Sequence, residues 1–295
     1  MAALLYCTLT TMIQQTAPKL PATMNTEPAA KPWACYAASV LALAMASATP
    51  AWSQESVAAP AIAGAQTRLD QPFTAPPSAE LDFEVTGKVS GFGYKAKAKL
   101  DWQHNGSTYQ AQQSIRAPII GTRSQQSEGQ IAQHYLEPLS FKDSSRSKRN
   151  LTFDPANSTV FIPATKETRP SPAGAQDRLS VFFQLAGLVA ANPSLREKGQ
   201  TIPIWTVANN KQASWEFEVE SVESIGLPVG ELPAIKLKRI PKKEDDQIAE
   251  IWLSSEVGYL PVRIHFEDDG DAVDLQMTQY RFKEATTTPP SAPQP

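Results

Sequence analysis

Alternation of apolar and polar side chains is the feature that most constrains the fold of this chain. In YKAKAKLDW, residues 94–102, every second side chain is apolar or aromatic, and those between are lysine or aspartate. Successive side chains of a β-strand point to opposite faces, so this segment predicts a strand with one face in a core and one in water. Asn105-Gly106 follows, a dipeptide typical of a tight hairpin turn. The alternation resumes in residues 107–115, which predicts an antiparallel partner strand.

The same pattern continues through the rest of the chain. It returns near 215–219, 262–266 and 273–277, and turn-forming residues separate such segments at 154–158, 226–230 and 267–271. We expect roughly ten to twelve strands at spacings of about 8–12 residues, as in barrels and sandwiches. Short connections favour antiparallel neighbours, because parallel strands need long crossovers. One long interruption, between residues 162 and 201, breaks the series.

The interruption contains QDRLSVFFQLAGL, residues 176–188, which predicts a helix. Asp177 suits the helix start, Asn192-Pro193 ends it, and apolar side chains cover all but a narrow sector. Such a helix must be buried on most sides. We therefore predict a mainly β fold, in which a curved antiparallel meander winds into an open half-barrel around one apolar helix.

Two roles for the helix remain open. It completes the core and does nothing further, or it leaves an apolar cavity between itself and the sheet. In the second case the facing side chains predict the lining residues, which are Leu100, Trp102, Phe182, Phe183, Leu185, Trp215 and Phe217.

The N-terminal region is typical of a secretory signal peptide. Lys31 precedes an apolar run at 34–48, and small residues follow at Ala51 and Ser53. We predict export, with cleavage after Ser53. The run is shorter than the roughly 20 residues of a membrane span, and an uncleaved anchor is the alternative. Residues 1–23 are odd for a signal peptide, so we expect that the true start is Met24.

The remaining boundaries follow from composition. Residues 54–79 and 284–295 are rich in proline and small residues, which predicts a disordered linker and a disordered tail around a β-rich domain at 80–283. Both cysteines, Cys7 and Cys35, lie in the segment expected to be removed, so the mature chain would contain neither a disulfide nor a thiol nucleophile. We expect the mature form to be soluble, without a transmembrane helix.

No catalytic or cofactor motif is present. The sequence has no GxSxG, HExxH, Walker or GxGxxG pattern. His265 and Glu267 would share a strand face, but two ligands are too few for a metal site, and His104 and His134 stand far away. We therefore predict no catalytic residues, cofactor or metal. The net charge of −3 gives no reason to expect nucleic-acid binding.

One basic run, KDSSRSKRN at 142–150, has two interpretations. Such a run is usually a solvated strand edge that resists pairing with other chains. The alternative is contact with anionic lipid headgroups or an acidic partner.

Three elements of the second half carry a family resemblance. QDRLS at the helix entry, GLPVGELPAIKL at 226–237 and IAEIWLSSEVGYLPVRIHF at 248–266 resemble the bacterial domain of unknown function 3108 family. The resemblance implies an exported envelope protein with a sheet wound around a helix. The family has no established activity, so it supplies no functional residues. The implied shape is also similar to the lipoprotein-carrier half-barrels of the Gram-negative periplasm, so the resemblance implies a periplasmic location in a Gram-negative bacterium.

These observations favour a non-enzymatic periplasmic cell-envelope protein that binds a hydrophobic ligand or lipid. The alternatives are a scaffold or adaptor for an envelope protein partner and, less favoured, an envelope hydrolase.

Overall fold

The computed structural model describes residues 69–117, 121–144, 150–208, 212–243 and 246–284. The expected signal peptide at 1–53, most of the expected linker and nearly all of the expected tail lie outside the described residues. So does most of the basic run at 142–150. Within the described part of the chain, no helix combines the length and the apolarity that crossing a membrane requires.

The described residues form one 14-stranded antiparallel sheet. The strands of its first half are β1 (Ala79–Val89), β2 (Phe92–His104), β3 (Thr108–Ala117), β4 (Gly121–Ile131), β5 (Leu136–Asp143), β6 (Leu151–Asp154), β7 (Thr159–Ile162) and β8 (Glu167–Pro170). Those of its second half are β9 (Thr201–Val207), β10 (Gln212–Leu227), β11 (Gly230–Arg239), β12 (Ile248–Leu253), β13 (Pro261–Asp268) and β14 (Asp271–Phe282).

The order of the strands confirms the predicted meander. Each half is a run of sequential antiparallel neighbours, and the halves join where β1 pairs with β14. The free ends of the sheet are β8 and β9, so the sheet stays open. The strands are more numerous than the sequence predicts. Strands such as β7 and β8, of four residues each, are too short to show a clear alternation of apolar and polar side chains.

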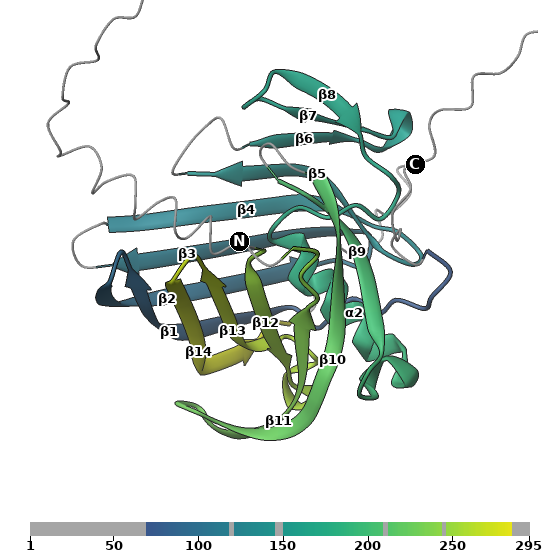
Figure 1. The fold of residues 1–295 in the computed structure, drawn as a ribbon. Helices are drawn as coiled ribbons and strands as arrows, with labels where there is room; N and C mark the ends of the chain where they lie inside the picture. Colours follow the sequence, from purple (N-terminus) through teal and green to yellow (C-terminus); the bar gives the residue numbers. More distant parts are fainter. Residues whose placement is uncertain (1–68, 118–120, 145–149, 209–211, 244–245, 285–295) are drawn as a thin grey trace, which may run out of the picture. The chain divides into compact units, whose positions relative to one another are not determined.

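The helix lies where the sheet curves, as predicted. Helix α2 (Ser180–Ala191) contacts β5 from one half of the sheet and β9 from the other, so the two halves lie on different sides of it (Figure 1). It starts later than predicted, because residues 176–179 form a turn and a bridge to β9. Short 3-10 turns occur at η2 (Pro155–Asn157), η3 (Pro193–Arg196) and η4 (Ser255–Val257).

The register of β1 and β2 fixes which side chains face the helix. Trp102 of β2 stacks on Phe183 of α2, so the even-numbered residues of β2 form the helix side of the sheet. We call this side the inner face. Lys95, Lys97 and Lys99 alternate with these residues and lie on the outer face, as the sequence pattern predicts. Asn105 closes the turn after β2 by accepting hydrogen bonds from the backbone N–H groups of Ser107 and Thr108.

Candidate functional site

Helix α2 and the inner face of the sheet form the candidate site. Ten of the twelve helix residues are buried. Phe183 of the helix stacks on Trp102 of β2, with 4.1 Å between the ring centroids and an angle of 15° between the ring planes. Phe182 contacts Phe266 of β13 from a greater distance, 6.5 Å between centroids. The helix therefore packs against strands from both halves of the sheet.

A buried acid holds the start of the helix. Asp177 accepts hydrogen bonds from the backbone N–H groups of Leu179 and Ser180 and from the hydroxyl of Ser127 on β4, at 2.6 Å. Because the Ser127 hydrogen points to Asp177, the Tyr109 hydroxyl donates to Ser127. Asp177 thus acts as a helix cap and also joins the helix to the sheet.

Burial raises the pKa of Asp177, and the hydrogen bonds that it accepts from Ser127, Ser180 and Leu179 offset this only in part. Burial also raises the pKa of Tyr109 well above its ordinary value. Asp177, Ser127 and Ser180 are completely buried. A hydroxyl enclosed in this way is out of reach of a substrate, so the cluster serves the packing of the helix.

Two glutamine side chains attach the helix region to β5. Gln184 accepts a hydrogen bond from the backbone N–H of Leu136 at 2.7 Å, and Gln176 donates to the carbonyl of the same residue at 2.6 Å. The two amides therefore satisfy both backbone groups of Leu136, as a neighbouring strand would. Gln176 also bridges β9 through its backbone, with bonds to Trp205 and Val207.

Residues 71–78, which we call the strap, lie against helix α2. The Thr74 N–H donates to the carbonyl of Gly187, and the ring of Phe73 lies where a Cβ on Gly187 would be, at 2.2 Å. Asn192 at the helix end donates to the carbonyl of Pro72. The strap therefore contacts the helix along its second half.

The far end of the strap attaches to the sheet. The indole N–H of Trp102 donates to the carbonyl of Pro76 at 2.9 Å, and Ser78 accepts from the His104 N–H. Pro77 packs against Gly258 after η4. The sequence places residues 71–78 in a linker, whereas the structure gives them contacts with the helix and β2.

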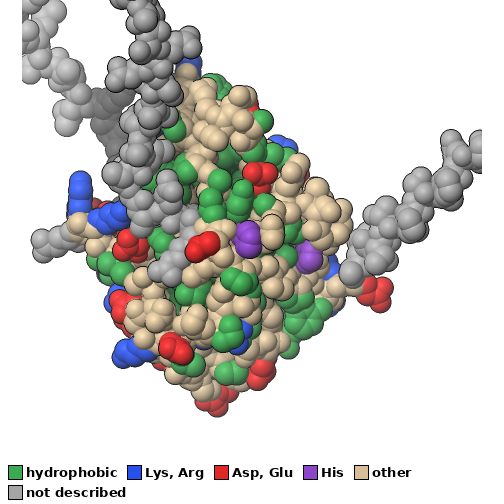
Figure 2. Space-filling model, turned by 90° about the vertical axis from the view of Figure 1, so that its right-hand side faces the viewer, with side chains coloured by type: hydrophobic (Ala, Val, Ile, Leu, Met, Phe, Trp, Pro, Cys, Tyr) green, Lys and Arg blue, Asp and Glu red, His purple; other side chains and the backbone are tan. Residues whose placement is uncertain are grey.

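On the side of the molecule shown in Figure 2, apolar side chains lie between polar ones and charged ones of both signs.

Six of the seven predicted lining residues are buried, and Trp215 is half-buried. Trp102 meets Phe183, while Trp215 contacts Phe217 edge-on at 6.1 Å and lies beneath the guanidinium of Arg239. The structure thus brings together pairs of these residues. Their role as a cavity lining stays a prediction.

Two hollows have other linings. One of about 130 Å³ lies beside the loop 171–175 and the turn after β6, and includes Tyr135 and Phe153. The other, of about 460 Å³, is lined by residues of β1, β2 and β3. Neither hollow includes any of the seven side chains that the sequence predicts to line a cavity.

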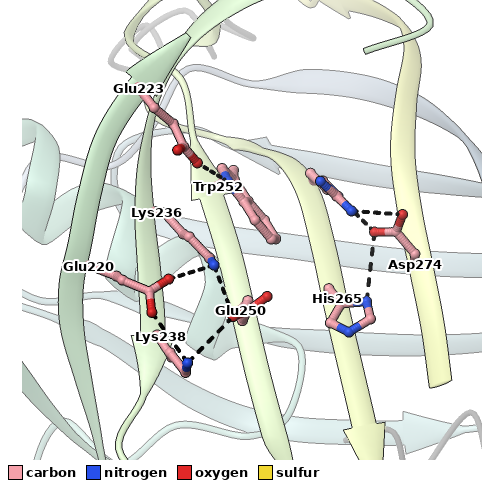
Figure 3. A network of polar contacts seen from close by, with 9 residues as sticks. Glu220, Glu223, Lys236, Lys238, Glu250, Trp252, His265 and Asp274 are labelled. Carbon is pink, nitrogen blue, oxygen red and sulfur yellow. Dashed lines mark hydrogen bonds and ion pairs between the residues drawn. The ribbon is translucent and has the colours of Figure 1, made fainter. Parts of the chain in front are cut away.

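A network of charges surrounds Trp252 on the outer face (Figure 3). The indole donates to Glu223 at 2.8 Å, and the cations of Lys236 and Arg263 lie 5.0 and 4.6 Å from its ring centroid. Lys236 also pairs with Glu250 at 2.9 Å. Trp252 is nearly fully buried by this packing. The WLS element therefore stabilises the sheet through cation–π and ion-pair contacts.

The outer network also accounts for His265. Arg263 forms two bonds to the carboxylate of Asp274, and His265 lies 3.9 Å from the same carboxylate. Among the residues that the structure describes, no group of three or more His, Cys, Asp or Glu side chains is arranged to hold a metal ion.

Solved structures resemble the fold at low sequence identity. A beta-barrel-like protein of domain of unknown function DUF1849 from Brucella abortus has a TM-score of 0.50 at 7% identity, covering 72% of this chain and 100% of that one. A putative outer membrane lipoprotein-sorting protein domain from Vibrio parahaemolyticus scores 0.26 at 11% identity, covering 70% and 86%. A LolA superfamily protein from Nitrosomonas europaea scores 0.22 at 11% identity, covering 73% and 90%. Of these three, the Brucella structure alone reaches a score that supports a common fold.

Comparison with curated proteins gives no significant match. The family described as "Protein of unknown function (DUF3108)" matches residues 82–278, which span β1 to β14. This is the family that the helix entry and the WLS element indicate. The chain belongs to the DUF3108 family.

Proposed function

We propose that the protein is a non-enzymatic, exported cell-envelope protein of the periplasm that binds a hydrophobic ligand or lipid between helix α2 and the inner face of the sheet. The observation that carries the proposal is the helix itself. It is apolar on nearly every side and lies between an open sheet and a strap. Export is supported by the signal-like sequence before residue 54.

The open sheet makes ligand entry physically reasonable. A closed barrel would have to break a strand pair to admit a ligand, whereas β8 and β9 form no pair with each other. In the structure, Trp102 and Phe183 are stacked, so a ligand must displace the helix or the strap. Binding therefore requires movement of the part that covers the inner face.

The free energy gained by burying a long apolar chain is larger than the cost of breaking the hydrogen bonds that join the strap to the helix. Burying an alkyl chain of about ten methylenes contributes roughly 8 kcal/mol of transfer free energy before ordering costs. Two hydrogen bonds join the strap to the helix end, from Thr74 to Gly187 and from Asn192 to Pro72. Breaking them costs roughly 1 kcal/mol each. A long acyl chain therefore offsets the loss of these two bonds and leaves several kcal/mol for the other contacts of the strap, whereas a solute of two or three methylenes gains roughly 2 kcal/mol and leaves nothing over.

Native mass spectrometry of the mature protein purified from the periplasm, combined with lipid extraction, tests this function. We expect a population with added mass and a matching fatty acid or phospholipid in the extract. Trp102→Ala enlarges the space beside Phe183 and should raise the occupied fraction. Lys142→Gln, an exposed change near the end of β5, serves as the control. A clean ligand-free mass for the wild type and for Trp102→Ala would mean that the helix only fills the core.

An adaptor role is the second candidate. It is supported by strand β8, which is mostly exposed and pairs on one side with β7 alone. An extended segment of a partner could add to such an edge. Thr168→Pro would remove a backbone N–H that faces away from β7, because the hydrogen-bonded pairs of this ladder alternate with the pair Phe161–Thr168. A pull-down from envelope extracts in which this variant retains every partner would count against edge pairing.

A further inference from the structure

The inner face changes from apolar to polar along strands β3 and β4. The Tyr109 hydroxyl donates to Ser127, and Ser127 donates to Asp177 at the helix start, so these side chains of β3 and β4 lie on the helix side of the sheet. Every second residue of each strand shares that side. Further along, these residues are Gln113 and Ile115 on β3, which pair in register with Gln125 and Arg123 on β4. We call Gln113, Gln125 and Arg123 the polar patch.

The side chains of the polar patch have no partner among the residues that the structure describes. Gln113 is only 5% exposed, yet its amide forms no hydrogen bond there. The guanidinium of Arg123 is half-buried and forms neither an ion pair nor a hydrogen bond, and its Nε is enclosed without an acceptor. Buried polar groups are almost always hydrogen-bonded, and a charge that loses water without gaining a partner is costly. The polar patch therefore has bonding capacity that the fold does not use.

Other arginines of the described chain differ in this respect. Arg239 of β11 is more deeply buried, but it donates to the carbonyl of Gln247 and to the carboxylate of Asp246. A carboxylate does lie near the polar patch, since Asp143 of β5 pairs in register with Gln125. Asp143 forms no ion pair with Arg123 and takes part in another contact. Arg123 therefore remains the cation of this region that can bind an anion.

The polar patch continues from the apolar surface that meets the helix. Gln113 pairs with Leu100, and Ala111, the preceding inner-face residue of β3, pairs with Trp102. Arg123 lies opposite Ile115, four residues from Ala111, or roughly 13 Å along the strand. The inner face thus offers an aromatic surface at the helix and a cation at a distance that an extended alkyl chain of medium length can span.

A ligand with an oxyanion at one end of an apolar chain complements both parts. The guanidinium fork matches two oxygens of a carboxylate or phosphate, and glutamine amides donate to the same kind of oxygen. A wholly apolar ligand would leave Arg123 without a partner, and an inorganic anion would not use the surface beside Phe183. We infer that the ligand is an anionic amphiphile, whose carboxylate or phosphate is bound by the polar patch while its chain lies beside Trp102 and Phe183. This inference rests on the proposed function, because it names the class of ligand for the same site.

Isothermal titration of the mature chain with three ten-carbon ligands tests the inference. Decanoate, decyl phosphate and 1-decanol have the same chain length and differ at the head. We expect both anions to bind the wild type at least tenfold more tightly than 1-decanol, since a hydrogen bond to a charged group is stronger than one to a neutral hydroxyl. Tighter binding of decyl phosphate would identify a phosphate-bearing lipid, and tighter binding of decanoate would identify a fatty acid.

Two arginine variants make the test specific. Arg123→Gln should weaken the binding of both anions by roughly tenfold or more and leave that of 1-decanol unchanged. The matched control is Arg116→Gln, which removes the same charge from an exposed residue on the outer face of β3, opposite Lys97. It should bind all three ligands as the wild type does. Urea unfolding verifies the fold of each variant, and Arg123→Gln should be at least as stable as the wild type because it removes a charge without a partner.

The outcomes separate this inference from the proposed function. Equal affinity of the wild type for 1-decanol and for the two anions would overturn the inference and leave an apolar ligand site in place. Equal loss of anion binding in Arg123→Gln and Arg116→Gln would overturn it too, because the effect would then be one of overall charge. Absence of binding for all three ligands would contradict the proposed function together with the inference. The comparison of ligands on the wild type decides even if Arg123→Gln does not fold.

Discussion

Adding one methyl group at Gly187 should separate the strap from the helix. A Cβ built on Gly187 lies 2.2, 2.7 and 2.8 Å from three ring atoms of Phe73. Carbon atoms in contact are normally about 3.5–4.0 Å apart, so the ring would have to move by more than an ångström. The hydrogen bonds at Pro72 and Thr74 hold the backbone on both sides of Phe73, so the ring must leave its position on the helix or these bonds must break.

Two opposing terms determine the size of the effect. Gly→Ala inside a helix is worth about 1 kcal/mol of stability, whereas overpacking costs roughly 1–3 kcal/mol. In the wild-type background we expect Gly187→Ala to lower the free energy of unfolding by up to about 2 kcal/mol. In a Phe73→Ala background the clash is gone, and the same change should raise it by about 1 kcal/mol. The double-mutant cycle therefore predicts a coupling of roughly 1–3 kcal/mol.

Urea unfolding of the wild type, both single variants and the double variant measures this coupling. Hydrogen exchange of the Thr74 amide adds a local measurement, because that amide donates to Gly187. It should exchange faster in Gly187→Ala, provided that the strap is displaced. Additivity of the two changes to within about 0.5 kcal/mol would refute the packing of Phe73 on the helix.

Three further predictions concern other contacts of the helix and sheet. Because burial raises the pKa of Asp177, the folded state holds its proton to higher pH than the unfolded state, so this group's contribution to stability falls as pH rises above its ordinary pKa of 3.8. The stability of Asp177→Asn relative to the wild type should therefore increase as pH rises from 4 toward neutral, roughly until the raised pKa is passed; a difference independent of pH in urea unfolding would count against it. Gln184→Leu leaves the buried N–H of Leu136 without an acceptor and should cost about 1–3 kcal/mol, with faster exchange of that amide, and unchanged exchange would contradict the bond. Trp252→Phe keeps an aromatic ring between the cations and loses the bond to Glu223, so it should cost roughly 1 kcal/mol, against about 3–5 kcal/mol for Trp252→Ala; equal costs in thermal unfolding would show that the ring is unimportant.

The fold follows from the sequence wherever side chains alternate. The pattern at 94–102 gives both the strand β2 and the face that meets the helix. Strand β8 has no such signal, because it is four residues long and mostly exposed at the sheet's edge. Strand β9 is buried on both faces, so its side chains do not alternate in polarity.

The strap could not be read from the sequence, because its order depends on distant partners. Three prolines and small residues in QPFTAPPS are typical of a linker, whereas Trp102 and Gly187 give the segment its hydrogen bonds and packing. A weak signal did exist. Gly187 is a poor helix former within an apolar helix, which often marks close approach of another segment.

For the seven predicted lining residues, the sequence predicts burial but not which side chains meet. Alternation correctly places Trp102 and Phe217 in the interior. It does not give positions around a curved sheet, so it could not show that Trp102 meets Phe183 while Trp215 lies beneath Arg239. Whether these side chains line a cavity depends on how the helix moves, which the spacing of residues does not encode.

A reversible lock between strap and helix tests the central claim most directly. The wild-type chain has no cysteine after Cys35, so the pair Phe73→Cys, Gly187→Cys adds the only thiols of the expected mature form. The two positions are neighbours, since a ring atom of Phe73 lies 2.2 Å from the Cβ built on Gly187. The measurement is the binding of a fluorescent long-chain fatty acid to the same sample before and after reduction. The account predicts binding in the reduced form and its loss in the oxidised form; equal binding in both forms, or none in either form and none in the wild type, would contradict a ligand site beneath the strap and helix.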